Sequence, residues 1–191
     1  MNREKIARET AGDNKMKKSI FALITLSVGL LLSACSQDNG SSDPTKEQQD
    51  IKEMVSEYSG NKDADVRASI TSNQLILIDK NENKTPYDLP EDEFFVAIAP
   101  YVETTHPWET HSLTGCQGEL TNKEFDLYIE DDEGNVVIDK TVKSQSNGFI
   151  DLWLPRDKTY KVTVTRDGKK AEQEISTFDG DLTCIATMQL M

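Results

Sequence analysis

The chain contains 191 residues, of which 34 are Asp or Glu and 21 are Lys or Arg, so its formal charge at pH 7 is −13. An acidic surface repels phosphate backbones, and this excludes nucleic acid as a partner. Most of the carboxylates are interpreted as a solvated surface. Without the N-terminal segment considered next, roughly 150 residues remain, enough for one domain with its own core.

The first 34 residues have the layout of a secretory signal. Lys17 and Lys18 precede an apolar run over residues 20–32 that is too short to span a bilayer. The following Leu-Ser-Ala-Cys35 resembles the bacterial lipoprotein signal, in which the cysteine becomes the lipidated first residue of the mature protein. The resemblance implies an extracytoplasmic protein, at the cell surface or facing the periplasm, with a lipid anchor on Cys35. Removing six basic and three acidic residues with the signal changes the formal charge from −13 to −16.

The N-terminal boundaries follow from this interpretation. Met16 is a more natural start than Met1, so residues 1–15 are either an upstream start or an extended basic n-region. Residues 35–44 comprise the lipidated cysteine and a polar stretch rich in breakers, which predicts a flexible tether. Residues 45–191 are predicted to form a single β-rich domain, for the reasons given below.

One amphipathic helix is predicted at the start of this domain. Thr45-Lys-Glu-Gln48 has the pattern of a capping box, and Gly60 is a stop signal. Between them, apolar residues recur at helical spacing: Ile51, Met54, Val55 and Tyr58. This stripe is interpreted as a contact with the core.

From Ala68 onward the apolar residues follow the period of a β-strand. Continuous apolar runs over residues 75–78 and 94–98 predict strands covered on both faces. Alternating apolar residues predict further strands over residues 125–129, 136–138, 150–154 and 160–164. Asp167-Gly168 predicts a hairpin after the last of these. The fold is therefore predicted to be mainly β, an antiparallel β-sandwich of immunoglobulin-like or prealbumin-like type with one N-terminal helix.

A last strand is predicted over residues 182–190. Cys184 and Met188 lie on its inward face together with Leu182, Ala186 and Leu190, whereas the outward face carries Thr183, Thr187 and Gln189. At strand rise Met188 lies about 13 Å from Cys184, so Met188 is interpreted as a core residue and not as a ligand.

Residues 104–119 contain both histidines of the chain, His106 and His111, and place Cys116 at the same interval beyond the second. A proline after the first histidine and glycines around the cysteine predict a loop, so the three side chains can converge. If the loop packs against the last strand, Cys184 joins them. Thiolates and imidazoles together suit Cu(I), Zn(II) or Cu(II).

A disulfide between Cys116 and Cys184 is the alternative to a metal site. Outside the cytoplasm such a bond persists, and across a loop of this length it would stabilise the fold by about 4 kcal/mol. The spacing alone leaves both interpretations open.

Three stretches resemble the CueP family of extracytoplasmic copper-binding proteins. They are Phe94-Phe-Val-Ala-Ile-Ala-Pro100 with Thr105-His-Pro107, then His111-Ser-Leu-Thr-Gly-Cys-Gln-Gly-Glu119, and Asp181-Leu-Thr-Cys184. The resemblance extends from about Thr45 to the C-terminus. It implies a protein of copper resistance that sequesters copper, passes it on, and reduces Cu(II) to Cu(I) through cysteine thiols.

Residue by residue, the resemblance implies that Cys116 and Cys184 bind copper and carry any redox chemistry, with His111 and His106 as further metal ligands. Trp108, interpreted from the sequence as a packing aromatic, stands where one branch of the family has a third cysteine, so a three-sulfur site is not implied. Zinc is a competing ion. The expected partners are the copper ion, a copper-receiving protein or a thiol reductant, and the membrane through the lipid anchor.

Catalysis in the strict sense is not implied. Oxidation of two thiols to one disulfide releases two electrons, so one molecule reduces two Cu(II) ions and then needs another thiol pair to restore it. Two other functions remain open. One is a surface β-sandwich lipoprotein in which Cys116–Cys184 is only a structural disulfide. The other is a thiol redox partner for other proteins, although no Lys or Arg lies beside either cysteine to lower its pKa.

Overall fold

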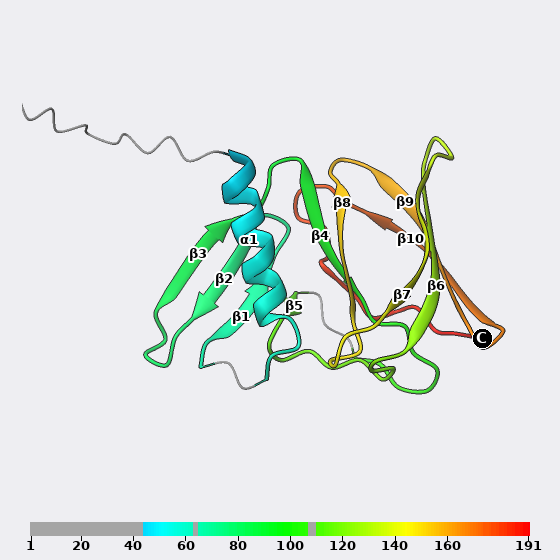
Figure 1. The fold of residues 1–191 in the computed structure, drawn as a ribbon, viewed down its shortest axis with the longest axis horizontal. Helices are drawn as coiled ribbons and strands as arrows, with labels where there is room; N and C mark the ends of the chain where they lie inside the picture. The colour runs from blue at the N-terminus through cyan, green and yellow to red at the C-terminus, as the bar shows by residue number, and fades with distance from the viewer. Residues whose placement is uncertain (1–43, 63–64, 107–109) are drawn as a thin grey trace, which may run out of the picture. The chain divides into compact units, whose positions relative to one another are not determined.

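The computed structural model describes residues 44–62, 65–106 and 110–191, with the side chains described from Gln48 onward. These residues lie in one compact unit, Ser41–Met191 (Figure 1). The expected signal segment, the lipidation site Cys35 and the packing aromatic Trp108 lie outside the described residues. Within the described ranges, no helix is both long enough and apolar enough to cross a membrane.

One helix and three small sheets make up the described unit. Helix α1 (Pro44–Tyr58) precedes all the strands. The first sheet has the order β3-β2-β1-β5 and contains β1 (Arg67–Ile70), β2 (Gln74–Ile78), β3 (Lys84–Asp88) and β5 (His111–Ser112). The second has the order β11-β4-β8 and contains β4 (Glu93–Ile98), β8 (Ile150–Pro155) and β11 (Cys184–Ile185). The third has the order β10-β9-β6-β7 and contains β6 (Glu124–Asp131), β7 (Val136–Lys143), β9 (Thr159–Arg166) and β10 (Lys169–Ser176).

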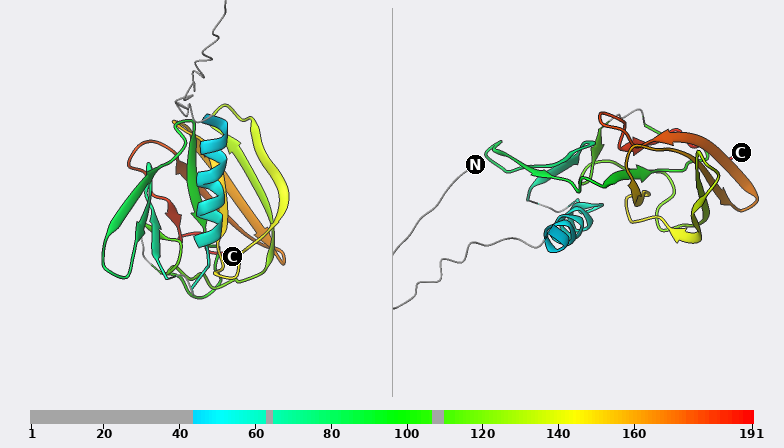
Figure 2. Two further views of the ribbon diagram at one scale, coloured as in Figure 1. Left: turned by 60° about the vertical axis from the view of Figure 1, so that its left-hand side comes forward. Right: turned by 90° about the horizontal axis from the view of Figure 1, so that it is seen from above.

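The β11-β4-β8 sheet separates two hydrophobic cores. The sandwich core fills the space against the third sheet, and its largest members are Phe94, Ile98, Phe125, Leu127, Ile129, Leu154 and Tyr160. The helix-side core lies against α1 and the first sheet, and it contains Ile51, Val55, Ile70, Leu75, Phe95, Leu113, Cys116, Phe149 and Cys184. In Figures 1 and 2, β4 and β8 accordingly run between α1 and the strands of the third sheet, β6, β7, β9 and β10.

Most of the predicted pattern is confirmed by this arrangement. In β4, successive residues Phe94 and Phe95 enter different cores, which explains why the apolar run over residues 94–98 is continuous. The alternating residues of β6, β8 and β9 face the sandwich core. The hairpin turn between β9 and β10 has positive φ angles of 51° at Asp167 and 76° at Gly168, as a type I′ turn requires. The mainly β sandwich with one N-terminal helix is therefore the observed fold.

The predicted helix is also present. Ile51 and Val55 are buried in the helix-side core, and Met54 and Tyr58 pack against it. The helix begins at Pro44, one residue before the predicted cap, and the side chain of Thr45 is not among those described. The capping box therefore stays a prediction.

Two sequence interpretations around the first sheet are wrong. The run over residues 75–78 was expected to be covered on both faces, but only Leu75 is buried in β2, because one face of this sheet lies on the molecular surface. The proline-containing stretch that follows forms β3, which was not predicted. Pro86 is tolerated there because β3 is an edge strand, where one row of N–H groups needs no partner in the sheet.

The predicted last strand is wrong over most of its length. Only Cys184 and Ile185 form a strand, which runs parallel to β4, and beyond them one bridge joins Gln189 to Tyr101. Leu182, expected inside, is 50% exposed, and Thr183, expected outside, is 1% exposed. Residues 183–186 are all buried because this stretch passes between the two cores, whereas beyond it the predicted alternation holds, with Met188 and Leu190 buried and Thr187 and Gln189 exposed. Cys184 and Met188 are both buried, as predicted, but in different cores.

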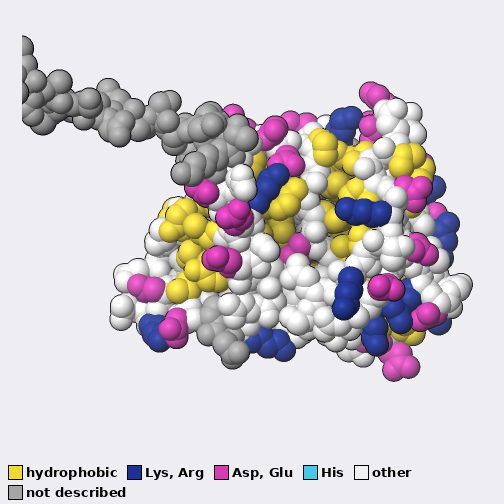
Figure 3. Space-filling view, in the orientation of Figure 1, with side chains coloured by type: hydrophobic (Ala, Val, Ile, Leu, Met, Phe, Trp, Pro, Cys, Tyr) yellow, Lys and Arg dark blue, Asp and Glu magenta, His cyan; other side chains and the backbone are white. Residues whose placement is uncertain are grey.

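The surface agrees with the interpretation of the charges. On the face shown in Figure 3, acidic and basic side chains are interspersed instead of forming one field of a single sign. Such a distribution is typical of a solvated surface.

Candidate metal centre

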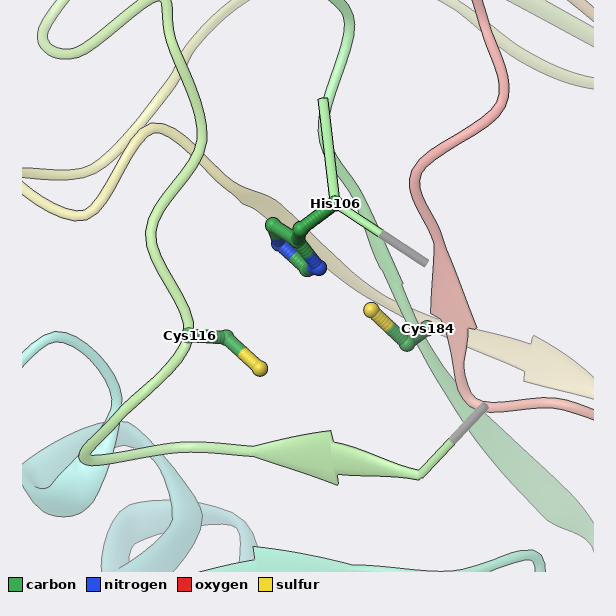
Figure 4. Close-up of side chains that lie close together, drawn as sticks. All are labelled: His106, Cys116 and Cys184. Atoms are coloured by element: carbon green, nitrogen blue, oxygen red, sulfur yellow. The ribbon is translucent and has the colours of Figure 1, made fainter. Parts of the chain in front are cut away.

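Three segments far apart in the sequence bring their side chains together at one end of the helix-side core. His106 follows β4, Cys116 follows β5, and Cys184 begins β11 (Figure 4). The position of Cys184 is fixed by the sheet, since it lies opposite Ala97 of β4, whose N–H donates to the carbonyl of Thr183 at 2.9 Å.

The geometry of the three side chains fits a single ion. One ligand atom from each of His106, Cys116 and Cys184 lies within 4.8 Å of the other two. An ion that bonds sulfur at about 2.3 Å and nitrogen at about 2.0 Å needs ligand atoms at such separations. Both cysteines are buried free thiols, so the disulfide of the alternative interpretation is not formed in this structure.

Cys116 is held by a tight turn after β5. Its N–H donates to the carbonyl of Ser112 at 3.0 Å, and its Sγ accepts from the N–H of Ser112 at 3.4 Å. Two residues later the N–H of Gly118 donates to the carbonyl of Asn147 at 2.6 Å. A Cβ on Gly118 would lie 2.9 Å from the carbonyl oxygen of Gly148, so glycine is needed for this close approach.

The segment that leads to His106 is held by Glu119. Oε2 of this carboxylate accepts three backbone N–H groups, from Val102 at 3.0 Å and from Glu103 and Thr104 at 2.9 Å. These hydrogen bonds, that from Thr104 first, hold the pKa of Glu119 below its usual value against the opposing effect of burial. The loop that carries Cys116 is thereby tied directly to the loop that carries His106.

His111 lies beside Cys116 but outside the group of three. It is fully buried on β5, where its ring centroid lies 4.5 Å from that of Phe149 and 6.1 Å from that of Phe95. Its backbone N–H donates to Oγ1 of Thr183 at 3.3 Å. The structure thus places the four expected metal ligands in one region, with three of them converging and the fourth next to a sulfur.

The ring nitrogens of both histidines are buried without hydrogen bonds. Among the described residues, no partner reaches Nδ1 or Nε2 of either His106 or His111. A buried polar atom left unsatisfied costs about 1–3 kcal/mol, so such atoms usually have a partner. Two imidazoles beside two free thiols are donors that soft and borderline metal ions accept.

The two thiols titrate as a pair. Hydrogen bonding with Cys184 is the largest cause that lowers the pKa of Cys116, and the adjacent His111 imidazole and the Ser112 N–H lower it further against the effect of burial. The imidazole is close enough for this effect, although its nitrogens do not have the distance and angle of a formed hydrogen bond. The same Cys116 contact, together with burial, raises the pKa of Cys184. The pair therefore loses its first proton readily and holds its second.

Sequence reasoning missed these causes because it looked for Lys or Arg next to each cysteine. It also missed Asp151, which projects from β8 on the same side as Phe149 of the helix-side core. Burial raises the pKa of Asp151, and hydrogen bonds from Ser59 and the charge of His111 oppose this. In an alternating strand a single aspartate is normally a surface residue, so the sequence contained no signal for it.

A pocket of about 470 Å³ opens beside the centre. It is lined by His106, Thr110, Ser112, Gly115, Cys116 and Gln117. Cys184 is not among these residues, so one histidine and one thiol of the centre face the pocket while the second thiol lies behind them.

Comparisons with known proteins identify the family of this chain. A family model described as periplasmic copper-binding protein CueP matches residues 50–189. The crystal structure of S.CueP superposes with a TM-score of 0.70 at 37% sequence identity, covering 74% of this chain and 89% of that one. Among curated proteins, no significant match is found.

Proposed function

This chain belongs to the CueP family, and we propose that it binds copper outside the cytoplasm through Cys116, Cys184 and His106. The observation that carries the proposal is the convergence of these three ligand atoms within 4.8 Å, in buried surroundings and without a disulfide. The residues matched by the family model include all three ligands.

The donor set favours the reduced ion. Two thiolates and one imidazole are soft or borderline ligands, and thiolate selects Cu(I) over harder cations. Zn(II) accepts the same donors and is the competing ion. Cu(II) is captured first by imidazole, and His106 faces the pocket through which an ion would arrive.

His111 is the fourth ligand in this proposal. It is fully buried, its ring nitrogens have no partner among the described residues, and it lies beside Cys116. A small movement of either side chain would allow its nitrogen to complete the coordination, and without that movement it supports the Cys116 thiolate.

The centre also suits reduction of Cu(II). Two thiols give one disulfide, two protons and two electrons, and the electrons convert two Cu(II) ions to two Cu(I) ions. The disulfide removes both sulfur ligands, so the same molecule holds Cu(I) again only after an external dithiol reduces it. Cys116 is the sulfur open to such a dithiol, because it lines the pocket and Cys184 does not.

The decisive experiment is an anaerobic Cu(I) titration of the reduced fragment that begins at Ser36, in competition with a colorimetric Cu(I) chelator. The fragment contains the whole compact unit Ser41–Met191. We expect one Cu(I) per molecule, with at least a hundredfold loss of affinity in Cys116→Ser and in Cys184→Ser. Failure of the unchanged fragment to compete with the chelator would return the two cysteines to a structural disulfide in a surface lipoprotein.

Met188 provides the matched control. It follows Cys184 closely in the sequence and carries a sulfur, but it is buried in the sandwich core. Met188→Leu should therefore leave the Cu(I) affinity unchanged. A parallel Zn(II) titration measures how strongly the competing ion binds.

The membrane anchor is tested separately. The cysteine of Leu-Ser-Ala-Cys35 is the acylated residue in this proposal, with a copper-receiving protein or thiol reductant reached from the membrane surface. Cells supplied with a clickable fatty acid should label the unchanged protein and not Cys35→Ser. Equal labelling of both proteins would show that Cys35 is not the lipid site.

A further inference from the structure

Unsatisfied polar atoms in the described part of the molecule gather around the metal centre and its immediate neighbours. Six buried side-chain atoms have no hydrogen-bond partner there: the four ring nitrogens of His106 and His111, Nδ2 of Asn147 and Oδ1 of Asp151. The carboxylate oxygen is the one atom of this set that can only accept when the group is ionised, and it needs an N–H or O–H donor.

Asp151 is held in place through its other oxygen. Oδ2 accepts from Nε2 of Gln145 at 2.9 Å and from Oγ of Ser59, at the end of α1. Because these two hydrogen bonds fix Oδ2, the direction of Oδ1 is also fixed, and Oδ1 can still accept a hydrogen bond. Since both donors come from outside the metal centre, the carboxylate is oriented independently of any ion.

His111 is the donor that fits this acceptor. Its ring packs on Phe149, which is two residues before Asp151 and so lies on the same face of the chain around β8. The charge of His111 reaches Asp151, where it lowers the pKa of the carboxyl, and it also reaches Cys116. The imidazole therefore lies near both a buried carboxylate and a buried sulfur.

We infer that Asp151 is the positioning residue of the centre: the two unsatisfied groups are not within hydrogen-bond geometry of each other in this structure, and a small rotation of the His111 ring lets Oδ1 accept its ring N–H and so select the tautomer whose other nitrogen faces Cys116. A neutral imidazole has one donor and one acceptor nitrogen, and the bond made by one decides what the other offers. Carboxylates commonly orient metal-binding histidines in this way. The role of Asp151 in metal binding rests on the proposed copper site, whereas the contact between Asp151 and His111 can be tested without copper.

The geometry is tested without metal, by long-range ¹⁵N–¹H correlation NMR of the reduced fragment 36–191. We expect His111 to populate one neutral tautomer with a protected, downfield ring N–H. Asp151→Leu should lose that N–H signal and mix the tautomers, and Asp151→Asn, which keeps a side-chain oxygen, should retain it. Absence of a protected ring N–H in the unchanged fragment overturns the inference whether or not Asp151→Leu folds.

The purpose is tested by Cu(I) competition with the same variants. Loss of an outer carboxylate typically weakens metal binding by about 10- to 100-fold, and we expect this for Asp151→Leu but not for Asp151→Asn. In a His111→Phe background, Asp151→Leu should cause no further loss, because the carboxylate acts through the imidazole. An equal loss in both backgrounds overturns the inference.

Asp126 supplies the control. It is an exposed aspartate of β6 that accepts from Thr141 at 2.8 Å, far from the helix-side core in the topology. Asp126→Leu should change neither the His111 spectrum nor the affinity. If the unchanged fragment binds no Cu(I) at all, the proposed function fails, while the NMR result still decides the role of Asp151.

Discussion

Individual residues of the centre take their properties from neighbours that are distant in sequence. Cys116 and Cys184 are the same residue type, yet their mutual contact moves their pKa values in opposite directions. Of the two, only Cys116 lines the pocket beside the centre. The residue that is easier to ionise is thus also the residue that an incoming ion or thiol meets first.

Glu119 allows a test of how the centre is assembled. Its three backbone hydrogen bonds fix the segment before His106. Glu119→Ala should therefore make the position of His106 less fixed, while every proposed metal ligand stays unchanged. For an exposed carboxylate we expect a loss of roughly 1 kcal/mol, about fivefold in Cu(I) affinity. Glu119→Gln, which keeps an oxygen, should lose less. Equal affinity in Glu119→Ala and the unchanged protein would show that His106 needs no such support.

The sequence predicted the residues of the centre better than their surroundings. His106, His111, Cys116 and Cys184 were identified because their types suit a soft metal and because one loop contains three of them. Asp151 was missed because its role depends on its burial. That burial is decided by the elements that pack on β8, which the sequence around Asp151 does not reveal.

Among the secondary-structure elements, local periodicity predicted strands where each face has a single environment. The alternation in β6 and β9 is regular because one face meets the sandwich core. It failed at residues 183–185, which are all buried because they pass between the two cores, and their parallel pairing is with β4, which is distant in sequence. The edge strand β3 was not predicted, because it contains Pro86, a residue that disfavours central strands.

The turn before β8 should be sensitive to a single methyl group. A Cβ on Gly148 would lie 2.7 Å from the carbonyl oxygen of Gly118, whereas one on Gly134 would meet nothing within 4 Å. The φ angles are 83° and 82°, so both Ala variants bear the same left-handed strain. In urea unfolding, Gly148→Ala should lose about 1–3 kcal/mol more than Gly134→Ala. Equal losses would mean that the Cys116 loop adjusts freely.

The β6–β7 turn should contribute acid sensitivity. Asp131 accepts from the N–H of Asn135 at 2.8 Å and from Nζ of Lys158 at 3.1 Å, and these contacts, those with Asn135 first, lower its pKa from 3.8 to about 2. A depressed carboxyl pKa contributes stability that is present above about pH 4 and is lost as the pH falls towards 2. Urea midpoints of the unchanged protein and Asp131→Asn should therefore differ at pH 7 and converge near pH 2. A constant difference would exclude this carboxyl as the cause.

For the whole molecule, the arrangement of two cores on one shared sheet explains how so small a unit builds a buried site. The sandwich core is continuous apolar packing, and it stabilises β4 and β8 from behind. The helix-side core can then hold unpaired histidines and thiols at one end without being the sole source of stability. We therefore expect substitutions of ligands to affect metal binding more than folding.

Copper should stabilise the molecule if it binds as proposed, because the three proposed ligands join the loop after β4, the loop after β5 and the start of β11. A ligand that binds only the folded state stabilises it by mass action, by about 2.7 kcal/mol when its free concentration is 100 times Kd. Anaerobic urea unfolding in chelator-buffered Cu(I) should show this gain in the unchanged protein and none in Cys116→Ser. Two thiols that bind Cu(I) equally well in the unfolded chain would abolish the gain, and the structure argues against this, since only folding brings Cys184 within reach of His106 and Cys116.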